Sequence, residues 1–282
     1  MQDRRPQSLD RSFTQRLMAR LNSDIDPRWA DLILGGCFFC TGLIDSVAFS
    51  VFSCFVAMQT GMADCRRAVV TGADMSTGNT VFVSLGISGL PKDSPRYSCI
   101  RSLIAIVCFC LGAIFFSTYH RHYGPLKRWV LLSSFLLQTI LILITAILAT
   151  TGVVAKDRVG ASTFPWSDLC PIALLAFQSA GQVVASRVLK YNSMPTVVLT
   201  SLYCDLMSDP HLFTAGLFDD ADRNRRAGGA IVLFAGASIG AALSKTSVGF
   251  GGIMWIASGL KAIMVLAWLL WKQKISRDST GV

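Results

Sequence analysis

Two charged side chains lie inside long apolar segments, where ionisable groups can carry chemistry in membrane proteins. Asp45 lies about midway along Leu32–Met58, and Lys261 lies near the middle of Ile253–Trp271. A charge at the centre of a bilayer costs about 2.5–3.5 kcal/mol on insertion scales, so both side chains should face the bundle interior or a cavity. Two interpretations are open: an ion or proton site, or a buried pair that locks the first helix to the last. Both predict that Asp45 and Lys261 approach each other or share one polar cavity.

A second polar feature is a row of side chains spaced by four residues. Gln178, Gln182 and Ser186 fall on one helix face at this spacing. The row either lines a solute pathway or hydrogen-bonds a neighbouring helix. Asn79, which directly precedes a short apolar stretch, is a further candidate. The candidate residues for a substrate or ion pathway are therefore Asp45, Asn79, Gln178, Gln182 and Lys261.

Signals for catalysis or metal binding are weak in this chain. Its three histidines, His120, His122 and His211, fall in or near loops. Neither a metalloprotease H-E-x-x-H pattern nor a P-loop lysine pattern occurs. Cys37 and Cys40 form a C-x-x-C motif, but zinc would need two more ligands. We therefore expect no catalytic residues, no metal site and no cofactor, and we expect that the protein is not an enzyme.

The composition indicates the environment in which these side chains must be placed. Apolar residues make up 52% of the chain, charged residues make up 15%, and the mean hydropathy is +0.51. Soluble domains carry about 25% charged residues, so this chain has too little charge to cover a surface in water. The net charge of +9 does not indicate nucleic-acid binding, because the basic residues punctuate apolar runs instead of forming one patch. The sequence predicts a polytopic integral membrane protein whose partner is the lipid bilayer.

Six segments are long and apolar enough to cross a hydrocarbon core of about 30 Å, which takes about 20 helical residues. They are Leu32–Met58, Ser102–Tyr119, Trp129–Ala155, Leu169–Ser186, Ala227–Ser244 and Ile253–Trp271. Two shorter apolar stretches, Thr80–Leu90 and Pro195–Met207, are typical of re-entrant or broken helices. The expected fold is all-α: a transmembrane helix bundle of about six spans plus two short or re-entrant helices.

Loop charge predicts the orientation of this bundle. If neither short stretch crosses, the N-terminus, the His120–Arg128 loop, residues 187–226 and the C-terminus share one side. Lysine and arginine are enriched in cytoplasmic loops, so this basic side should be cytosolic. We expect a multi-pass protein of the plasma membrane with both termini in the cytosol. A basic segment 1–28 and a tail 274–282 then flank a transmembrane domain at 29–273.

The order of elements indicates two related halves, at about 29–155 and 165–273. The sequence T-V-F-V-S at 80–84 is similar to T-V-V-L-T at 196–200, and each follows a long apolar segment. A glycine-bearing helix and a final apolar helix then close each half. Three spans per half would place the two copies in opposite orientations, as in the inverted repeats of many transporters.

Several motifs are similar to those of a known family. Thr77-Gly78-Asn79-Thr80, with the aspartate of Gly42-Leu43-Ile44-Asp45, resembles the YoaK-like family of small membrane proteins of bacteria and fungi. The fungal branch is similar also at A-F-Q-S-A-G-Q (176–182), P-T-V-V-L-T (195–200) and Y-C-D-L-M-S-D (203–209). The resemblance covers about residues 29–273. It implies a membrane protein of about six spans and no established activity.

The chain departs from the family pattern after its first helix. In the family this helix runs almost directly into T-G-N, whereas here a polar insertion follows Met58-Gln59-Thr60-Gly61. Removing residues 61–77 or residues 62–78 gives the same product and restores the family pattern. The segment also brings four charges beside elements expected in or near the membrane, where unpaired charge is costly. We interpret it as a translated intron; the alternative is a genuine extra loop.

These observations favour a transporter or permease for a small solute or ion. The alternative is a non-transporting membrane scaffold or assembly factor, in which the same polar residues only pack helices. A water-accessible cavity that reaches Asp45 would favour transport, and a closed dry core would favour the scaffold.

Overall fold

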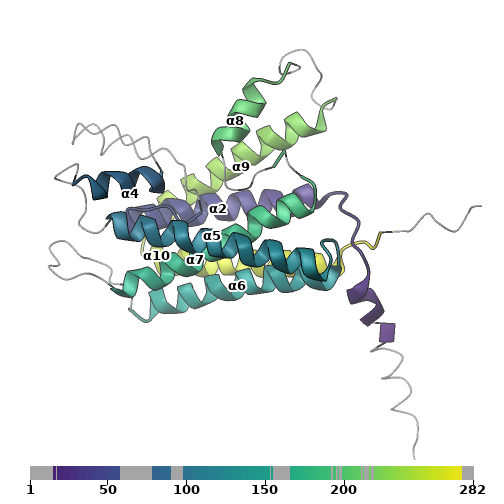
Figure 1. Ribbon diagram of the computed structural model, residues 1–282, viewed down its shortest axis with the longest axis horizontal. Helices are drawn as coiled ribbons and strands as arrows, with labels where there is room; N and C mark the ends of the chain where they lie inside the picture. Colours follow the sequence, from purple (N-terminus) through teal and green to yellow (C-terminus); the bar gives the residue numbers. More distant parts are fainter. Residues whose placement is uncertain are drawn as a thin grey trace, which may run out of the picture.

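In a computed structural model, the long elements of the chain are α-helices gathered in one bundle (Figure 1). The structure describes residues 15–16, 18–57, 78–89, 98–152, 154, 166–191, 193–194, 196, 199–210, 212, 216 and 219–274. Residues 58–77, which include nearly all of the segment interpreted as an intron, lie outside the described residues. The end of the predicted tail, residues 275–282, lies outside them too.

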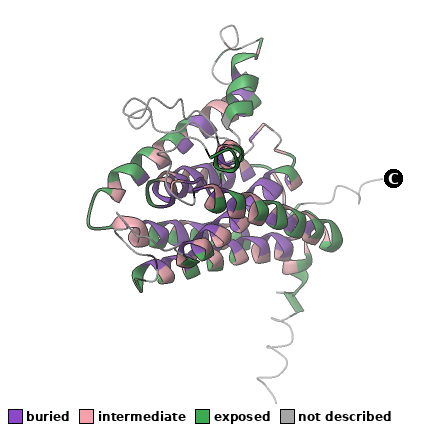
Figure 2. Cartoon of the chain, turned by 60° about the vertical axis from the view of Figure 1, so that its left-hand side comes forward, coloured by how far each residue is buried: buried purple, intermediate pink, exposed green. Residues whose placement is uncertain are grey.

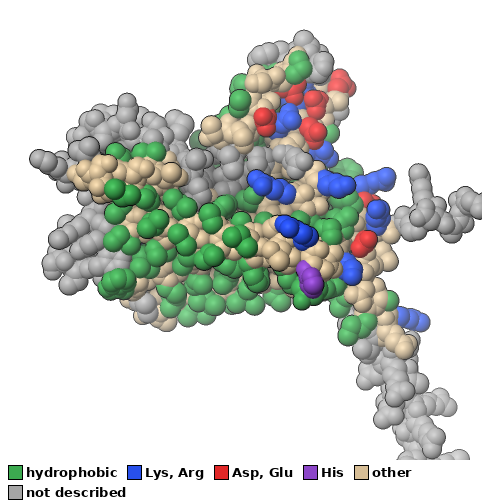
Figure 3. Space-filling view, viewed as in Figure 1, with side chains coloured by type: hydrophobic (Ala, Val, Ile, Leu, Met, Phe, Trp, Pro, Cys, Tyr) green, Lys and Arg blue, Asp and Glu red, His purple; other side chains and the backbone are tan. Residues whose placement is uncertain are grey.

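Six of the described helices are long enough to cross a membrane. They contain 22 to 26 residues each, which is about 33–39 Å at 1.5 Å per residue. Their outward faces carry exposed aliphatic and aromatic side chains, and hydrophobic atoms cover much of the side of the bundle (Figure 3). The prediction of a polytopic membrane protein is confirmed. The six are α2 (Ala30–Phe52), α5 (Ser98–Tyr123), α6 (Arg128–Thr150), α7 (Trp166–Val188), α9 (Ala221–Ser244) and α10 (Gly249–Leu270).

Two short helices stand where the two short apolar stretches were predicted. Helix α4 (Asn79–Ile87) packs against α5, and helix α8 (Leu199–Met207) packs against α9. Helix α8 lies at the upper edge of the bundle in Figure 1. Each has 9 residues, or about 13 Å of helix, which is less than half of a hydrocarbon core. The prediction that neither stretch crosses as a full span is confirmed for these helices.

The two ends of the described chain meet the α5–α6 turn at one end of the bundle. The Ile25 N–H donates to the Leu126 carbonyl at 3.0 Å, and the Asp26 N–H donates to the Lys272 carbonyl at 3.1 Å. Lys and Arg side chains gather at this end, on the right in Figure 3. The N-terminal segment, the α5–α6 turn and the C-terminal segment therefore lie at one end of the bundle. We call this the basic end, and define it by residues 18–28, 124–128 and 271–274.

The helices pack in a pattern that is unchanged when the two halves are exchanged. Helix α2 packs mainly on α9, and its counterpart α7 packs mainly on α5. Helices α6 and α10 pack on each other, and α6 contacts α7 as α10 contacts α2. This is the arrangement expected of two repeats related by a two-fold axis, in which helices of one half pack against helices of the other.

Glycines allow the closest of these helix crossings. A Cβ atom at Gly236 would collide with the Phe39 carbonyl of α2, and one at Gly42 would collide with the backbone of α9. At the equivalent α5–α7 crossing, a Cβ at Gly112 would lie 2.5 Å from the Phe177 carbonyl oxygen. Small residues at such positions let helix backbones approach in membranes, where packing drives helix association. Figure 2 shows the buried faces of the helices turned toward one another.

The first helix is shorter than its hydropathy predicts. We expected the apolar run to continue as helix to Met58, but α2 ends at Phe52 and Ser53 takes a left-handed conformation with φ 56°. Residues 53–57 continue as irregular chain, in which Val56 and Ala57 are buried. The error has a physical reason: these residues are apolar because they are buried, although they are not helical.

Candidate functional site

The irregular residues after α2 form a segment held against the interior of the bundle, which we call the re-entrant segment (residues 53–57). The Val56 and Ala57 N–H groups donate to Asp45 Oδ1 at 2.9 and 2.8 Å. Asp45 precedes Phe52, the last residue of α2, by seven positions, or about 10 Å of helix. The chain therefore leaves α2 and turns back beside it. Asp45 satisfies backbone donors that would otherwise be unpaired in an apolar interior.

Asn79 fixes the same segment from the start of α4. The Phe55 N–H donates to Asn79 Oδ1 at 3.1 Å, and Asn79 Nδ2 donates to the Phe55 carbonyl at 2.6 Å. An amide side chain is suited to this role, because its oxygen accepts and its NH2 group donates side by side, as the backbone of a neighbouring strand would. Asp45 and Asn79, predicted as separate pathway candidates, thus act together on one stretch of backbone.

Three residues that the sequence reasoning missed complete this attachment. Ser179 Oγ donates to the Val56 carbonyl at 3.1 Å. Arg101 donates to the Phe52 carbonyl at 3.1 Å and pairs with the Asp168 carboxylate at 2.9 Å. A signal for Ser179 was present, since it lies between the two glutamines of the A-F-Q-S-A-G-Q motif.

Lys261 is fully buried, and its partners differ from the one predicted. Its Nζ donates to Gln138 Oε1 at 2.7 Å, lies 3.9 Å from Cys37 Sγ and stands 5.1 Å from the centre of the Phe135 ring. The expected ion pair with Asp45 is absent from the described residues. Cys37 and Asp45 are eight residues apart on α2, or about 12 Å, so Lys261 contacts a different level of that helix. The other form of the prediction, one polar cavity shared by both charges, stays a prediction.

Gln178 and Gln182 are the most unusual of the predicted residues. Both side chains have no exposed surface, and the amide oxygen and nitrogen of each have no hydrogen-bond partner among the described residues. The third member of the row differs, because Ser186 Oγ donates to the Val183 carbonyl of its own helix at 2.9 Å. Buried amides in proteins nearly always have partners. The two glutamines therefore need an explanation beyond packing.

Helix α7 connects the two clusters of polar residues. Ser179 contacts the re-entrant segment, while a Cβ at Gly181 would lie 2.8 Å from Nε2 of Gln138, the residue that binds Lys261. The stretch that carries Gln178 and Gln182 thus lies between Asp45 with Asn79 on one side and Gln138 with Lys261 on the other. We call this set the central polar layer: Asp45, Asn79, Gln138, Gln178, Ser179, Gln182 and Lys261.

Two surface pockets, of about 490 and 150 Å³, lie at the basic end. None of the residues of the central polar layer lines either of them. In the part of the chain that the structure describes, no group of three or more His, Cys, Asp or Glu side chains is placed to hold a metal ion. Near these pockets, the Tyr191 hydroxyl donates to the Pro27 carbonyl at 2.8 Å. Burial raises the pKa of this hydroxyl, and the negative charge of Asp31 raises it further.

Comparison with known proteins identifies the family. The model of a protein family of unknown function, DUF1275, matches residues 68–267, well over half of the chain. The chain belongs to the DUF1275 family. The resemblance to YoaK-like membrane proteins of unknown function is thereby confirmed. No curated protein and no solved structure matches this chain.

The DUF1275 match contains four of the five predicted pathway residues. Asn79, Gln178, Gln182 and Lys261 lie within it, whereas Asp45 precedes its first residue. The match begins inside the segment interpreted as an intron and leaves out the first helix. A break in the family pattern between α2 and α4 would produce such a boundary.

Proposed function

We propose that this DUF1275 protein is a transporter or permease, and that its central polar layer binds a small solute during transport. The observation that carries the proposal is the pair Gln178 and Gln182, two buried amides on one helix without protein partners in the described chain. Leaving a buried polar group unpaired costs about 1–3 kcal/mol. A bound solute that accepts and donates hydrogen bonds would supply the missing partners.

The charge of Lys261, at one end of the layer, indicates the class of solute. The partners of Lys261 within the described residues are an amide oxygen, a thiol and an aromatic ring, and none of these carries a formal negative charge. A buried ammonium group is costly unless an anion balances it. We therefore propose a solute that carries negative charge and reaches Lys261 from the glutamine side of α7.

The architecture of the bundle is consistent with alternating access. In transporters built from inverted repeats, solutes bind near the bilayer midplane between the repeats, beside interrupted helices. Here the broken end of α2 and the glutamine-bearing part of α7 meet at the Ser179–Val56 hydrogen bond, and these two helices are counterparts in the two halves. We also propose that the basic end faces the cytosol, because basic loops favour the cytosolic side. The membrane that we propose for the protein is the plasma membrane.

The alternative, a non-transporting scaffold or assembly factor, is favoured by a different observation. Asp45 and Asn79 bind backbone groups of the re-entrant segment, which is a structural role that needs no solute. On that view the glutamines would make their hydrogen bonds to trapped water. The two proposals therefore differ at Gln178 and Gln182, and less at the other residues.

The test is a transport assay on purified protein in lipid vesicles. Vesicles with wild-type protein or with the double variant Q178L/Q182L receive a mixture of small anionic and neutral metabolites, and mass spectrometry identifies what enters. We expect wild type to admit anionic species above empty vesicles, and the double variant to admit none above that background. S186A is the matched control on the same helix face, and it should transport like wild type.

The stability of the double variant separates a lost binding site from a damaged fold. Leucine removes two unpaired amides from the interior, so Q178L/Q182L should be at least as heat-stable in detergent as wild type. A variant that is stable and inactive supports the proposal. If the stable double variant still transports the same solutes, or if wild-type vesicles take up no more than empty ones, the proposal is wrong.

A further inference from the structure

The smaller pocket at the basic end contains an unusual arginine. Arg128, the first residue of α6, is only 1% exposed. One of its guanidinium nitrogens, Nη2, donates to the Trp271 carbonyl at 2.7 Å, while Nε and Nη1 have no partner among the described residues. A guanidinium group carries five N–H donors and keeps its charge, so buried arginines are normally paired with anions.

A second arginine lines the same pocket. Arg20 and Arg128 share its wall with Leu21, Leu269 and Leu270, and none of these five residues is acidic. Two guanidinium groups close together repel each other unless an anion lies between them. A phosphate group matches the forked geometry of arginine donors, as a carboxylate does, and phosphate is the group that anionic membrane lipids present.

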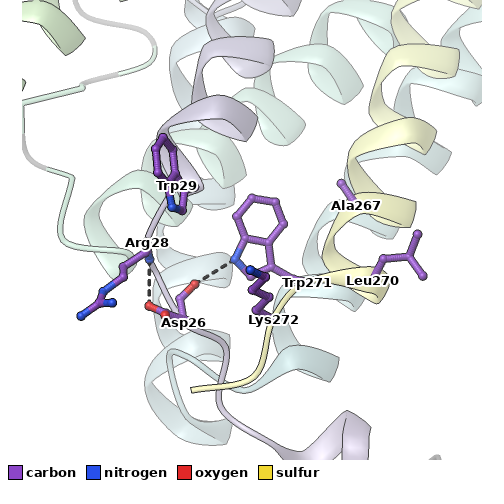
Figure 4. Close-up of a pocket in the computed structure, with 7 residues that line it drawn as sticks. All are labelled: Asp26, Arg28, Trp29, Ala267, Leu270, Trp271 and Lys272. Carbon is purple, nitrogen blue, oxygen red and sulfur yellow. Dashed lines mark hydrogen bonds between the residues drawn. The ribbon is translucent and has the colours of Figure 1, made fainter. Parts of the chain in front are cut away.

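The larger pocket adjoins the smaller one, because Leu270 lines both. Figure 4 shows its basic residue Lys272 beside the indole of Trp271, while Arg28 lies beyond Asp26 and points away from that indole. Asp26 also lines this pocket, where its carboxylate accepts the Arg28 N–H at 3.0 Å and its carbonyl accepts the Trp271 indole N–H at 2.8 Å. The negative charge of Asp26 disfavours a phosphate here, so the smaller pocket is the better place for one.

The surroundings of the two pockets favour a lipid over a free ion. Leu270 is 72% exposed at the end of α10, and Trp29 is 71% exposed on the opposite wall. Tryptophans are enriched at the membrane–water boundary, and basic pockets at helix ends bind the head groups of anionic lipids. An inorganic phosphate would leave the apolar wall formed by Leu269 and Leu270 uncovered, whereas an acyl chain would cover it.

We propose that the basic end binds an anionic phospholipid, with its phosphate between Arg20 and Arg128 and an acyl chain along Leu269 and Leu270 of α10. This site is separate from the central polar layer and does not depend on transport. Arg20 of the N-terminal segment and Arg128 at the start of α6 then contact the head group from two sides.

The test measures which lipids remain bound to the purified protein. Full-length protein is exchanged into detergent with equal amounts of phosphatidylglycerol and phosphatidylcholine of identical acyl chains, and native mass spectrometry gives the ratio of bound lipids. Wild type should retain phosphatidylglycerol preferentially. A basic residue near an anionic head group contributes about 1 kcal/mol, so R20Q should lower the ratio about fivefold. R128K, which keeps the charge but not the fork, should lower it too.

R121Q is the matched control, since Arg121 is an exposed arginine near the α5–α6 turn that lines neither pocket. Its ratio should equal that of wild type. R20Q decides the outcome even if changes at Arg128 impair folding, because the Arg20 side chain is exposed. The proposal is wrong if R20Q keeps the wild-type ratio. It is also wrong if inorganic phosphate, and not phosphatidylglycerol, raises the melting temperature of delipidated protein.

Discussion

At the scale of single residues, the polar candidates of this chain have three different roles. Asp45 and Asn79 bind the backbone of the re-entrant segment. Lys261 binds Gln138, and the two glutamines of α7 lack partners in the described chain. The sequence predicted that Asp45 and Lys261 face the bundle interior or a cavity, because a charge at the centre of a bilayer is costly. It could not predict their partners, since contacts across a bundle depend on helix rotation and on where a helix breaks.

The separation of Asp45 from Lys261 gives a prediction about energetic coupling. Lys261 contacts α2 at Cys37, which lies about 12 Å along the helix from Asp45. Mutational effects at sites more than about 7–10 Å apart add within about 0.5 kcal/mol. In a double-mutant cycle of D45N and K261M, measured by thermal unfolding in detergent, the effects on the free energy of unfolding should add. A coupling energy of several kcal/mol would show that the two charges interact directly after all.

At the scale of helices, apolar length predicted the six spans well but misplaced one end. Hydropathy continues through Cys54, Phe55 and Val56, so the first span was extended to Met58, yet α2 ends at Phe52. Buried positions carry apolar residues whether or not the backbone is helical, so hydropathy alone cannot locate the end of such a helix. Gly236 and Gly240, four residues apart on α9, both lie at the α2–α9 crossing.

This crossing allows a matched pair of glycine substitutions. G236A adds a Cβ against the Phe39 carbonyl, and it should lower the free energy of unfolding by about 1–3 kcal/mol, as overpacking does. G259A is the control within α10, where nothing lies within 4 Å of the added Cβ. It should be neutral or slightly stabilising, because alanine favours helix over glycine. Equal melting temperatures of the two variants would contradict the close crossing.

The contact between Phe55 and Asn79 bears on the segment interpreted as an intron. These residues are 24 positions apart in this chain, and they would be seven apart without the segment. Closing the shorter loop costs about 1 kcal/mol less in chain entropy. We expect mature transcripts to lack the codons of this segment and to join Thr60-Gly61 directly to Asn79. Sequencing of transcripts across the junction tests this, and messages that uniformly retain the segment would support a genuine loop.

At the scale of the whole molecule, helices of each half pack mainly against helices of the other half. The order of elements predicted the repeat, but which helices pair was not visible in the sequence, because every span is apolar and each could pack on several others. The structure pairs α2 with α9 and α7 with α5. This brings the broken end of α2 to the glutamine-bearing part of α7, which neither half could form alone.

The shared basic end predicts the topology. A small epitope inserted at Gly124 in the α5–α6 turn, or fused to either terminus, should be reached by antibody only after cells are permeabilised, because these segments lie together and carry basic residues. An epitope beside Lys245, at the turn between α9 and α10, should be reached in intact cells. Detection of the Gly124 epitope in intact cells would reverse the orientation.

The central claim, that Gln178 faces a solute pathway, is tested most directly by its access to water. In a variant whose native cysteines are replaced by alanine or serine, Q178C is treated with a small water-soluble thiol reagent, and L175C, an equally buried position on α7, serves as the control. Alternating access would expose the pathway in part of the population, so Q178C should react much faster than L175C in folded protein. If Q178C is as unreactive as L175C, the core is closed and the transport proposal is contradicted.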